Sequence, residues 1–175
     1  MGEQPFRDQH NRAARLARQP GVLAWVRLAR VFATVDRASA ELLRPWDLSV
    51  AQFDILAHLA ADEGTTQQQL ADTLLVTKGN VSQVVSKMER RGLVRRGREG
   101  RVRRLSLTDA GRTLAREVVP ALEALIAERL AVLTPAEQRD LLALLRKLDQ
   151  GLGGRAHRRS QANKRTSREE HHDGT

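Results

Sequence analysis

The chain has 175 residues, enough for one domain of ordinary size with short tails. Its residues are 41% hydrophobic but only 3% aromatic, a mixture typical of helices that pack through Leu, Val and Ala. The net charge of +9 favours a polyanionic partner such as nucleic acid or an anionic membrane, and the lack of cysteine excludes disulfides, thiolate metal sites, cysteine nucleophiles and thiol redox sensing.

The start of the chain favours a cytoplasmic protein. Residues 1–19 form a polar extension without the apolar core of a signal peptide. No run of about 18 apolar residues is present, so no membrane segment is expected. A long first helix is expected over about residues 21–44, because Leu28, Phe32 and Val35 recur at helical spacing before Pro45 ends it.

Further helix starts are marked by a Ser or Thr that is followed three residues later by Gln or Glu, because the two side chains satisfy each other's backbone donors. These pairs are Ser49 with Gln52, Thr66 with Gln69, and Thr134 with Glu137. The first opens a helix to about residue 61, and the second opens a short helix to about residue 75. Thr77 and Thr108 are further candidate N-caps.

A small hairpin is expected after the helix that Thr77 begins. Residues 102–107 alternate between apolar and polar side chains, as in a half-buried strand. Residues 93–96 are the expected partner strand, and Gly97 and Gly100 supply the turn between them.

Two helices follow the hairpin. One begins after Thr108 and is expected to kink at Pro120, which removes a backbone donor. The last begins after Thr134, ends near residue 152 and carries a wide apolar stripe that favours a partner. Residues 153–175 are basic and lack apolar periodicity, so we expect a disordered tail there.

Helix, short helix, turn, helix and hairpin in this order form a winged helix-turn-helix. The stretch TTQQQLADTLLVTKGNVSQVVSKMERRGLVRR, which starts at Thr65, resembles the MarR family of bacterial transcription regulators. Its LE-x-x-GL ending is Met88 to Leu93 here, where Gly92 can take the left-handed conformation that ends a helix and Leu93 can fold back onto it.

The resemblance spans residues 20–152 and implies a mainly α fold. The DNA-binding lobe would cover about residues 48–108. The helices at about 21–44 and 109–152 would form a dimerisation region. The implied protein is therefore a homodimer.

The resemblance also implies that the helix after Thr77 enters the major groove of duplex DNA. Its apolar side chains have helical spacing and are expected to face the core; they are Val81, Val84, Val85 and Met88. The remaining polar side chains suit phosphates and base edges. With the start of the short helix and the wing, the predicted DNA-binding set is Thr66, Gln67, Thr77, Lys78, Gly79, Asn80, Ser82, Gln83, Lys87, Arg98, Arg101 and Arg103.

The wing is rich in arginine, which suits a phosphate backbone or a narrow minor groove. The family's usual wing is longer and carries an Asp-x-Arg-Asp-Arg type tip, whereas this chain has only the short turn from Gly97 to Arg101. We assign the tip role to Arg98 and Arg101. The alternative is a surface hairpin whose charge protects it from edge pairing.

By resemblance the expected action is repression at a near-palindromic operator, with half-sites about 10 base pairs apart. A small aromatic or phenolic anion would release the DNA by favouring one of two states. The predicted pocket consists of Trp25, Arg27, Trp46 and Phe53, with Arg30 as an alternative cation. A constitutive, weakly specific DNA-architectural protein is the alternative function.

No enzyme and no cofactor are expected, because the sequence has no Gly-rich phosphate loop and no His or carboxylate set with catalytic spacing. Asp54, His58 and Asp62 share a helix face and could bind a metal, but a charge row on a helix surface is the favoured interpretation. A membrane-surface protein would need basic residues beside an exposed apolar helix face, whereas the basic residues here cluster on the hairpin and the tail.

Overall fold

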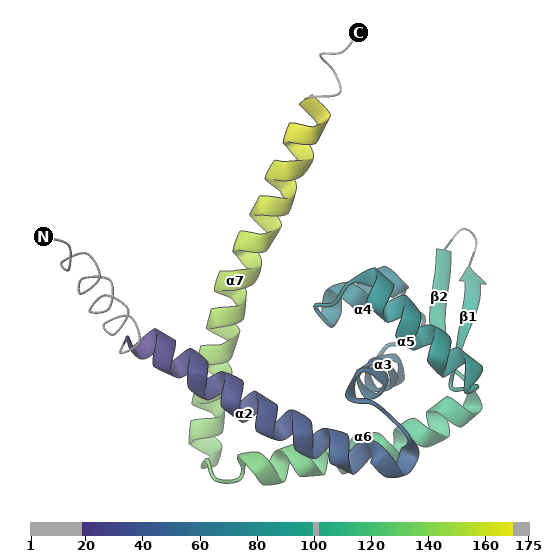
Figure 1. The fold of residues 1–175 in the computed structure, drawn as a ribbon, viewed down its shortest axis with the longest axis horizontal. Helices are drawn as coiled ribbons and strands as arrows, with labels where there is room; N and C mark the ends of the chain where they lie inside the picture. Colours follow the sequence, from purple (N-terminus) through teal and green to yellow (C-terminus); the bar gives the residue numbers. More distant parts are fainter. Residues whose placement is uncertain (1–18, 100–101, 170–175) are drawn as a thin grey trace, which may run out of the picture. The chain divides into compact units, whose positions relative to one another are not determined.

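The computed structural model describes residues 19–99 and 102–169. The chain divides into two compact units, one up to Ala127 and one from Glu128. The first unit holds most of the elements: α2 (Pro20–Leu43), the 3-10 turn η1 (Arg44–Trp46), α3 (Val50–Ala61), α4 (Gln67–Thr73), α5 (Lys78–Arg90), β1 (Val94–Glu99) and β2 (Val102–Leu107). Helix α6 (Asp109–Leu130) begins in this unit, and α7 (Pro135–Glu169) belongs to the second. The order from α3 to β2 confirms the predicted winged helix-turn-helix (Figure 1).

The predicted helix caps are present. The N–H of Gln52 donates to Ser49 Oγ at 3.3 Å while the N–H of Ser49 donates to Gln52 Oε1 at 2.9 Å. The same reciprocal pair joins Thr66 and Gln69 at the start of α4. Since these bonds are local, the spacing of the residues predicts them directly.

The end of α5 also follows the prediction. Gly92 has φ 68°, its N–H donates to Glu89 O at 2.9 Å, and the N–H of Leu93 donates to Met88 O at 3.0 Å. This is the two-bond pattern in which a left-handed residue closes a helix. Leu93 is 7% exposed, so it makes the apolar contact that accompanies this pattern.

One apolar core holds the winged lobe together. On α5, Val81, Val85 and Met88 are buried and Val84 is half-buried, which confirms the predicted inner face. They share the core with buried residues of α3, α4, the hairpin and α6, among them Leu56, Leu59, Leu70, Leu105, Leu107 and Val118. The core therefore fixes which face of α5 points to solvent.

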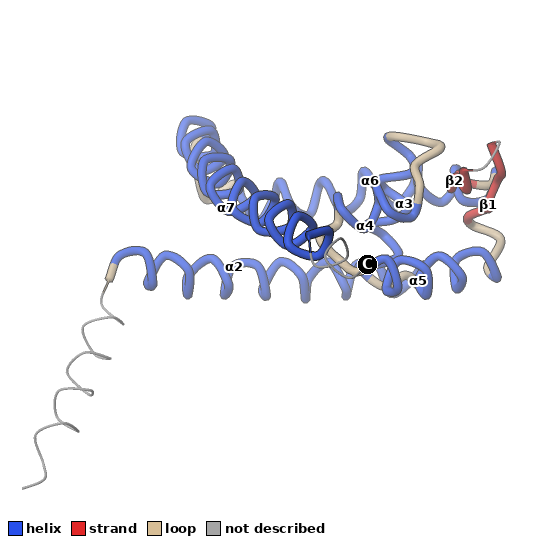
Figure 2. Tube along the Cα trace, turned by 90° about the horizontal axis from the view of Figure 1, so that it is seen from above, coloured by secondary structure: helices blue, strands red, loops and turns tan. Residues whose placement is uncertain are grey.

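The hairpin is a two-stranded antiparallel sheet in which Val94 pairs with Leu107 and Arg98 with Arg103. It is the only sheet in the described part of the chain (Figure 2). The sequence predicts the first strand at 93–96 and a turn from Gly97, but this boundary is wrong: the ladder continues to Glu99, and Gly97 pairs with Arg104 within it. Strand β2 also bonds to a segment outside the hairpin. The N–H of Leu105 donates to Thr65 O at 2.9 Å, so the loop before α4 is joined to the wing.

The last helix is longer than predicted. Helix α7 extends from Pro135 to Glu169, past the predicted end near residue 152 and into the stretch predicted to be disordered. Lengthening an existing helix needs no new nucleus, which is the costly step of helix formation. Helix α6 runs through Pro120, and its kink stays a prediction. No helix among the described residues is long and apolar enough to cross a membrane.

Asp54 is a half-buried carboxylate on α3. Burial raises its pKa above the ordinary 3.8, and the charge of Asp36 on α2 raises the pKa further. The folded protein therefore holds the carboxyl proton of Asp54 at higher pH than the unfolded chain does. At neutral pH, where the carboxylate is charged in both states, its burial lowers the free energy of unfolding. This loss of stability disappears as the pH falls through the raised pKa, because the group is then protonated.

We expect Asp54→Asn to raise the thermal unfolding midpoint near neutral pH, by an amount that shrinks as the pH falls towards about 4. Thermal scans by circular dichroism over a pH series measure this difference. Asp149→Asn, the same substitution at an exposed position of α7, is the control. A lower midpoint for Asp54→Asn at neutral pH would show that the carboxylate stabilises the fold.

Candidate nucleic-acid interface

The outer face of α5 presents a row of polar side chains. Thr77, Lys78, Asn80, Gln83 and Lys87 are all exposed or partly exposed. Thr77 caps the helix through its Oγ1, which accepts the N–H of Asn80 at 3.2 Å. The cap uses only the main chain of Asn80, so the side-chain amides of Asn80 and Gln83 stay available for a partner.

Two predicted residues of α5 differ from this row. Ser82 is half-buried, and its carbonyl oxygen accepts the hydroxyl of Ser86 at 2.8 Å. Gly79 is exposed, and a Cβ at this position would meet only Thr77 Oγ1, at 3.9 Å. The fold itself therefore does not require glycine at 79, and a close approach of DNA to its backbone stays a prediction.

At the start of α4 the two predicted residues are half-buried. The hydroxyl of Thr66 donates to Gln69 Oε1 at 2.8 Å, so its proton is already used within the cap. Gln67 lines a groove of about 240 Å³ together with Arg103 of β2 and Ser82 of α5. The fold thus brings together predicted residues from the short helix, the recognition helix and the wing.

Arg98 and Arg103 lie directly opposite each other in the hairpin ladder, and both are exposed. Neither has an ion-pair partner within the described residues. Like charges at directly opposed positions of an antiparallel pair repel each other. This pair therefore favours an anion beside the wing. Arg101 lies outside the described residues.

Arg96 connects the wing to α5, a role that the sequence analysis did not assign. Its guanidinium forms an ion pair with Glu89 and donates to Ser86 Oγ at 2.9 Å. It projects from the same face of the hairpin as Leu105, its ladder partner, so it points towards the helix. This inward position in the alternating strand is the signal that could have found it.

Two further arginines hold loops in place and were also missed. Arg91, just after α5, donates to the main-chain oxygens of Trp46 (3.0 Å) and Asp47. Arg104 donates from Nη1 to Gly64 O at 2.8 Å. The arginine-rich composition of the lobe therefore serves its own architecture as well as an anionic partner.

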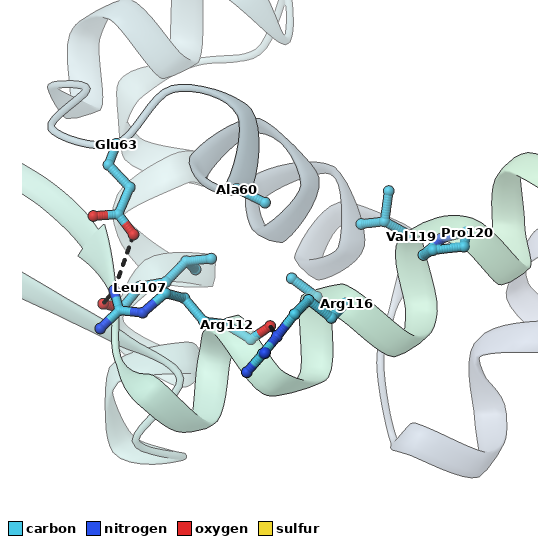
Figure 3. Close-up of a pocket in the computed structure, with 8 residues that line it drawn as sticks. Ala60, Glu63, Leu107, Arg112, Arg116, Val119 and Pro120 are labelled. Carbon is cyan, nitrogen blue, oxygen red and sulfur yellow. Dashed lines mark hydrogen bonds and ion pairs between the residues drawn. The ribbon is translucent and has the colours of Figure 1, made fainter.

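A second groove, of about 660 Å³, lies between the end of α3 and the first half of α6 (Figure 3). Apolar side chains line most of it, and Glu63, Arg112 and Arg116 add charge. Figure 3 shows the two arginines along one side, with Arg112 joined to Glu63 across the groove. Within the described residues, Arg116 has no carboxylate partner.

None of the four residues predicted for an effector pocket lines this groove. Phe53 is part of the core at 8% exposure, whereas Trp25 is 65% exposed on α2. Trp46 is half-buried and Arg27 is exposed. That set stays a prediction.

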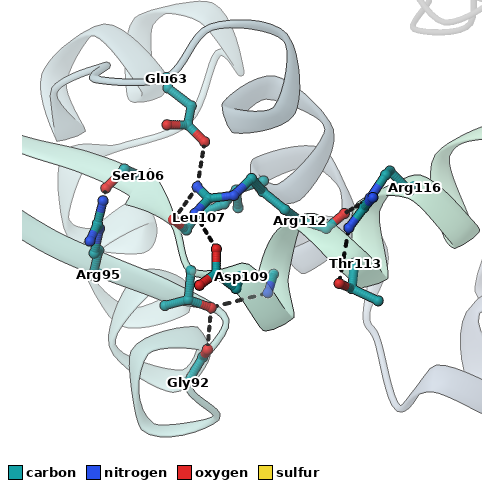
Figure 4. A network of polar contacts seen from close by, with 11 residues as sticks. Glu63, Gly92, Arg95, Ser106, Leu107, Asp109, Arg112, Thr113 and Arg116 are labelled. Atoms are coloured by element: carbon teal, nitrogen blue, oxygen red, sulfur yellow. Dashed lines mark hydrogen bonds and ion pairs between the residues drawn. The ribbon is translucent and has the colours of Figure 1, made fainter.

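A polar network surrounds the base of the wing (Figure 4). Arg112 donates to Asp109 Oδ1 at 2.6 Å, to Leu107 O at 2.9 Å and to Glu63 Oε1 at 2.9 Å. The hydrogen bond from Arg112, aided by its charge, lowers the pKa of Asp109. Thr108 donates its hydroxyl to Gly92 O. These contacts join the loop before α4, the hairpin and α6.

The chain is similar to known regulators. A family model described as MarR family matches residues 46–105. An uncharacterised HTH-type transcriptional regulator of Bacillus cereus is 32% identical over 73% of this chain and 88% of its own. The MarR family protein Rv2887 of Mycobacterium tuberculosis, in a crystal structure with DNA, is 31% identical with a TM-score of 0.60, covering 74% of this chain and 97% of its own. AbsC of Streptomyces coelicolor, a MarR family transcriptional regulator, is 25% identical with a TM-score of 0.71, covering 75% and 93%.

The family model covers the winged lobe, and each of the three similar proteins covers about three quarters of the chain. They confirm the fold class, and they agree with the interpretation that the chain is not an enzyme, because the proteins it matches are transcriptional regulators. The chain belongs to the MarR family of DNA-binding transcriptional regulators.

Proposed function

We propose that the protein is a sequence-specific repressor that binds a near-palindromic operator as a homodimer and leaves it when a small anionic effector binds. It would act in the bacterial cytoplasm, where the chromosome lies. The observation that carries the proposal is the exposed polar row on α5, because the core leaves this face no freedom to turn inwards.

In this proposal α5 lies in the major groove. Asn80 and Gln83 read base edges, since an amide can pair with both major-groove atoms of adenine. Lys78 and Lys87 contact phosphates or guanine acceptors. The wing neutralises phosphate charge through Arg98 and Arg103, whose mutual repulsion a phosphate would relieve.

Apolar side chains left exposed on the long helices support the homodimer. On α2, Leu23, Trp25 and Phe32 are 50%, 65% and 68% exposed. On α7, Leu144 and Leu152 are 66% and 59% exposed. Exposed apolar surface of this kind is typical of an interface with another copy.

The groove beside α6 is our candidate effector site. Rv2887 of Mycobacterium tuberculosis has also been crystallised in complex with salicylic acid, and the chain in that second structure aligns with this one at 32% identity. An apolar groove with Arg116 at its side offers the two features that an aromatic carboxylate needs, a nonpolar surface and a cation. The predicted set around Trp25 is less suited, because Phe53 is closed within the core.

Binding to the duplex upstream of the protein's own gene, compared with a shuffled duplex, tests the function. We expect fluorescence anisotropy to show about hundredfold tighter binding to the native duplex, with two protomers per site, over a salt series. Titrating salicylate into the complex then tests release. Equal binding to both duplexes with a steep dependence on salt would favour the alternative of a DNA-architectural protein. If the protein stays on the DNA at saturating salicylate, the release step of the proposal is wrong for this anion.

A further inference from the structure

The connection between α4 and α5 has an unusual backbone. Leu75 has φ 55°, in the left-handed region, and the N–H of Val76 donates to Ala71 O at 3.0 Å. The end of α4 therefore shares with the end of α5 a left-handed residue and one of the two closing hydrogen bonds, the one that Leu93 donates to Met88 O after α5. A Cβ is strained in this conformation and glycine is not, so leucine is an unfavourable choice here.

The side chain of Leu75 gains no packing in return. It is 87% exposed, and Val76 beside it is 41% exposed. In the equivalent closure of α5, the residue after the glycine is Leu93, which is 7% exposed. Leu75 thus combines backbone strain with an exposed leucine side chain, and such strain is concentrated at functional sites.

The position of Leu75 in the chain indicates what covers it. It lies two residues before Thr77, the N-cap of α5, and every residue from Leu75 to Asn80 is exposed, so Leu75 adjoins the start of the polar row in an uninterrupted exposed segment. The one prominent apolar group on the floor of a DNA major groove is the 5-methyl group of thymine. A leucine beside the recognition helix suits that group and none of the polar base edges.

We propose that Leu75 is a specificity-determining residue whose side chain packs against the 5-methyl group of one thymine in each half-site. The proposal rests on the proposed function, because it requires sequence-specific binding through α5. It adds an apolar contact to the polar readout by Asn80 and Gln83. Burial against the methyl group removes the leucine from water.

Selection from a random duplex library, followed by replacement of single thymines with deoxyuridine, tests this contact. Deoxyuridine keeps every hydrogen-bonding group of thymine and lacks only the methyl group. The proteins compared are the wild type, Leu75→Gly, which relieves the backbone strain and removes the side chain, and Leu75→Met, which keeps an apolar side chain. Thermal scans confirm that all three are folded.

We expect the wild type and Leu75→Met to enrich one thymine per half-site and to bind about fourfold less tightly for each such thymine that becomes deoxyuridine. Leu75→Gly should bind both duplexes equally. A Leu75→Gly variant that keeps the wild-type loss, or a wild type indifferent to deoxyuridine at every position, overturns the contact alone. A wild type that enriches no motif overturns the proposed function, and the contact with it.

Discussion

The double variant Asn80→Ala, Gln83→Ala is expected to lose about a hundredfold of the preference for the operator over random duplex, because each amide that pairs with a base contributes about 1–3 kcal/mol of discrimination. Both side chains are exposed, and only the main chain of Asn80 serves the cap of α5. Alanine therefore leaves the helix and the core intact. Anisotropy on the operator and on a shuffled duplex, at one salt concentration, measures the change.

A pair of wing variants gives this experiment a matched contrast. Arg103 lies on the hairpin face that carries Leu105, whereas Arg95 lies on the other face and donates to Ser106 Oγ at 3.0 Å. Arg103→Ala should weaken binding to both duplexes alike. It should also reduce, by about 1, the steepness with which the logarithm of the binding constant falls with the logarithm of the salt concentration. Arg95→Ala removes the same charge and should change the affinity and this slope less. If the double variant of α5 also weakened both duplexes equally, its amides would not read bases.

The parts of the fold that the sequence predicts well are those fixed by neighbours in the chain. A Ser or Thr three residues before Gln or Glu forms its cap wherever the helix goes, and Gly92 ends α5 by its own conformational freedom. The inner face of α5 follows from the helical period of its valines. Each of these is a local pattern, and each is confirmed.

The roles of the individual arginines required the tertiary structure. In the sequence Arg96 and Arg98 are equivalent members of a basic hairpin, yet Arg96 forms an ion pair with Glu89 and Arg98 is exposed opposite Arg103. Both lie on the hairpin face that carries Leu105, so strand alternation does not separate them, and which of the two reaches Glu89 depends on where α5 packs along the strand. The composition of the segment does not give that position.

The left-handed Leu75 was missed for a different reason. Propensity favours glycine, and to a lesser extent asparagine, at such a position, so a leucine gives no signal that a turn of this kind occurs there. A departure from local preference of this kind is visible only once the backbone is known.

Helix α6 approaches the segment after the recognition helix closely at Gly111. A Cβ built there would lie 2.0 Å from the carbonyl oxygen of Leu93 and 3.4 Å from Cβ of Leu107. The same carbonyl oxygen accepts the N–H of Thr108 at 3.1 Å, so it is held by the residue that precedes α6 and cannot simply move aside. Any larger residue at 111 must push α6 away from the junction of α5 and the wing.

Gly111→Ala is therefore expected to destabilise the protein by about 2 kcal/mol, because overpacking against backbone exceeds the gain of up to about 1 kcal/mol that alanine brings to a helix interior. Urea unfolding at fixed protein concentration measures the change. Gly151→Ala is the matched control for protomer stability: its Cβ would meet nothing within 4 Å in α7, so within the protomer only the propensity gain applies and the variant should be more stable than the wild type. Since displacement of α6 also disturbs the base of the wing, Gly111→Ala should weaken DNA binding. A Gly111→Ala protein as stable as the wild type would show that α6 can shift at this junction without loss, and that the contact with Leu93 does not fix the wing.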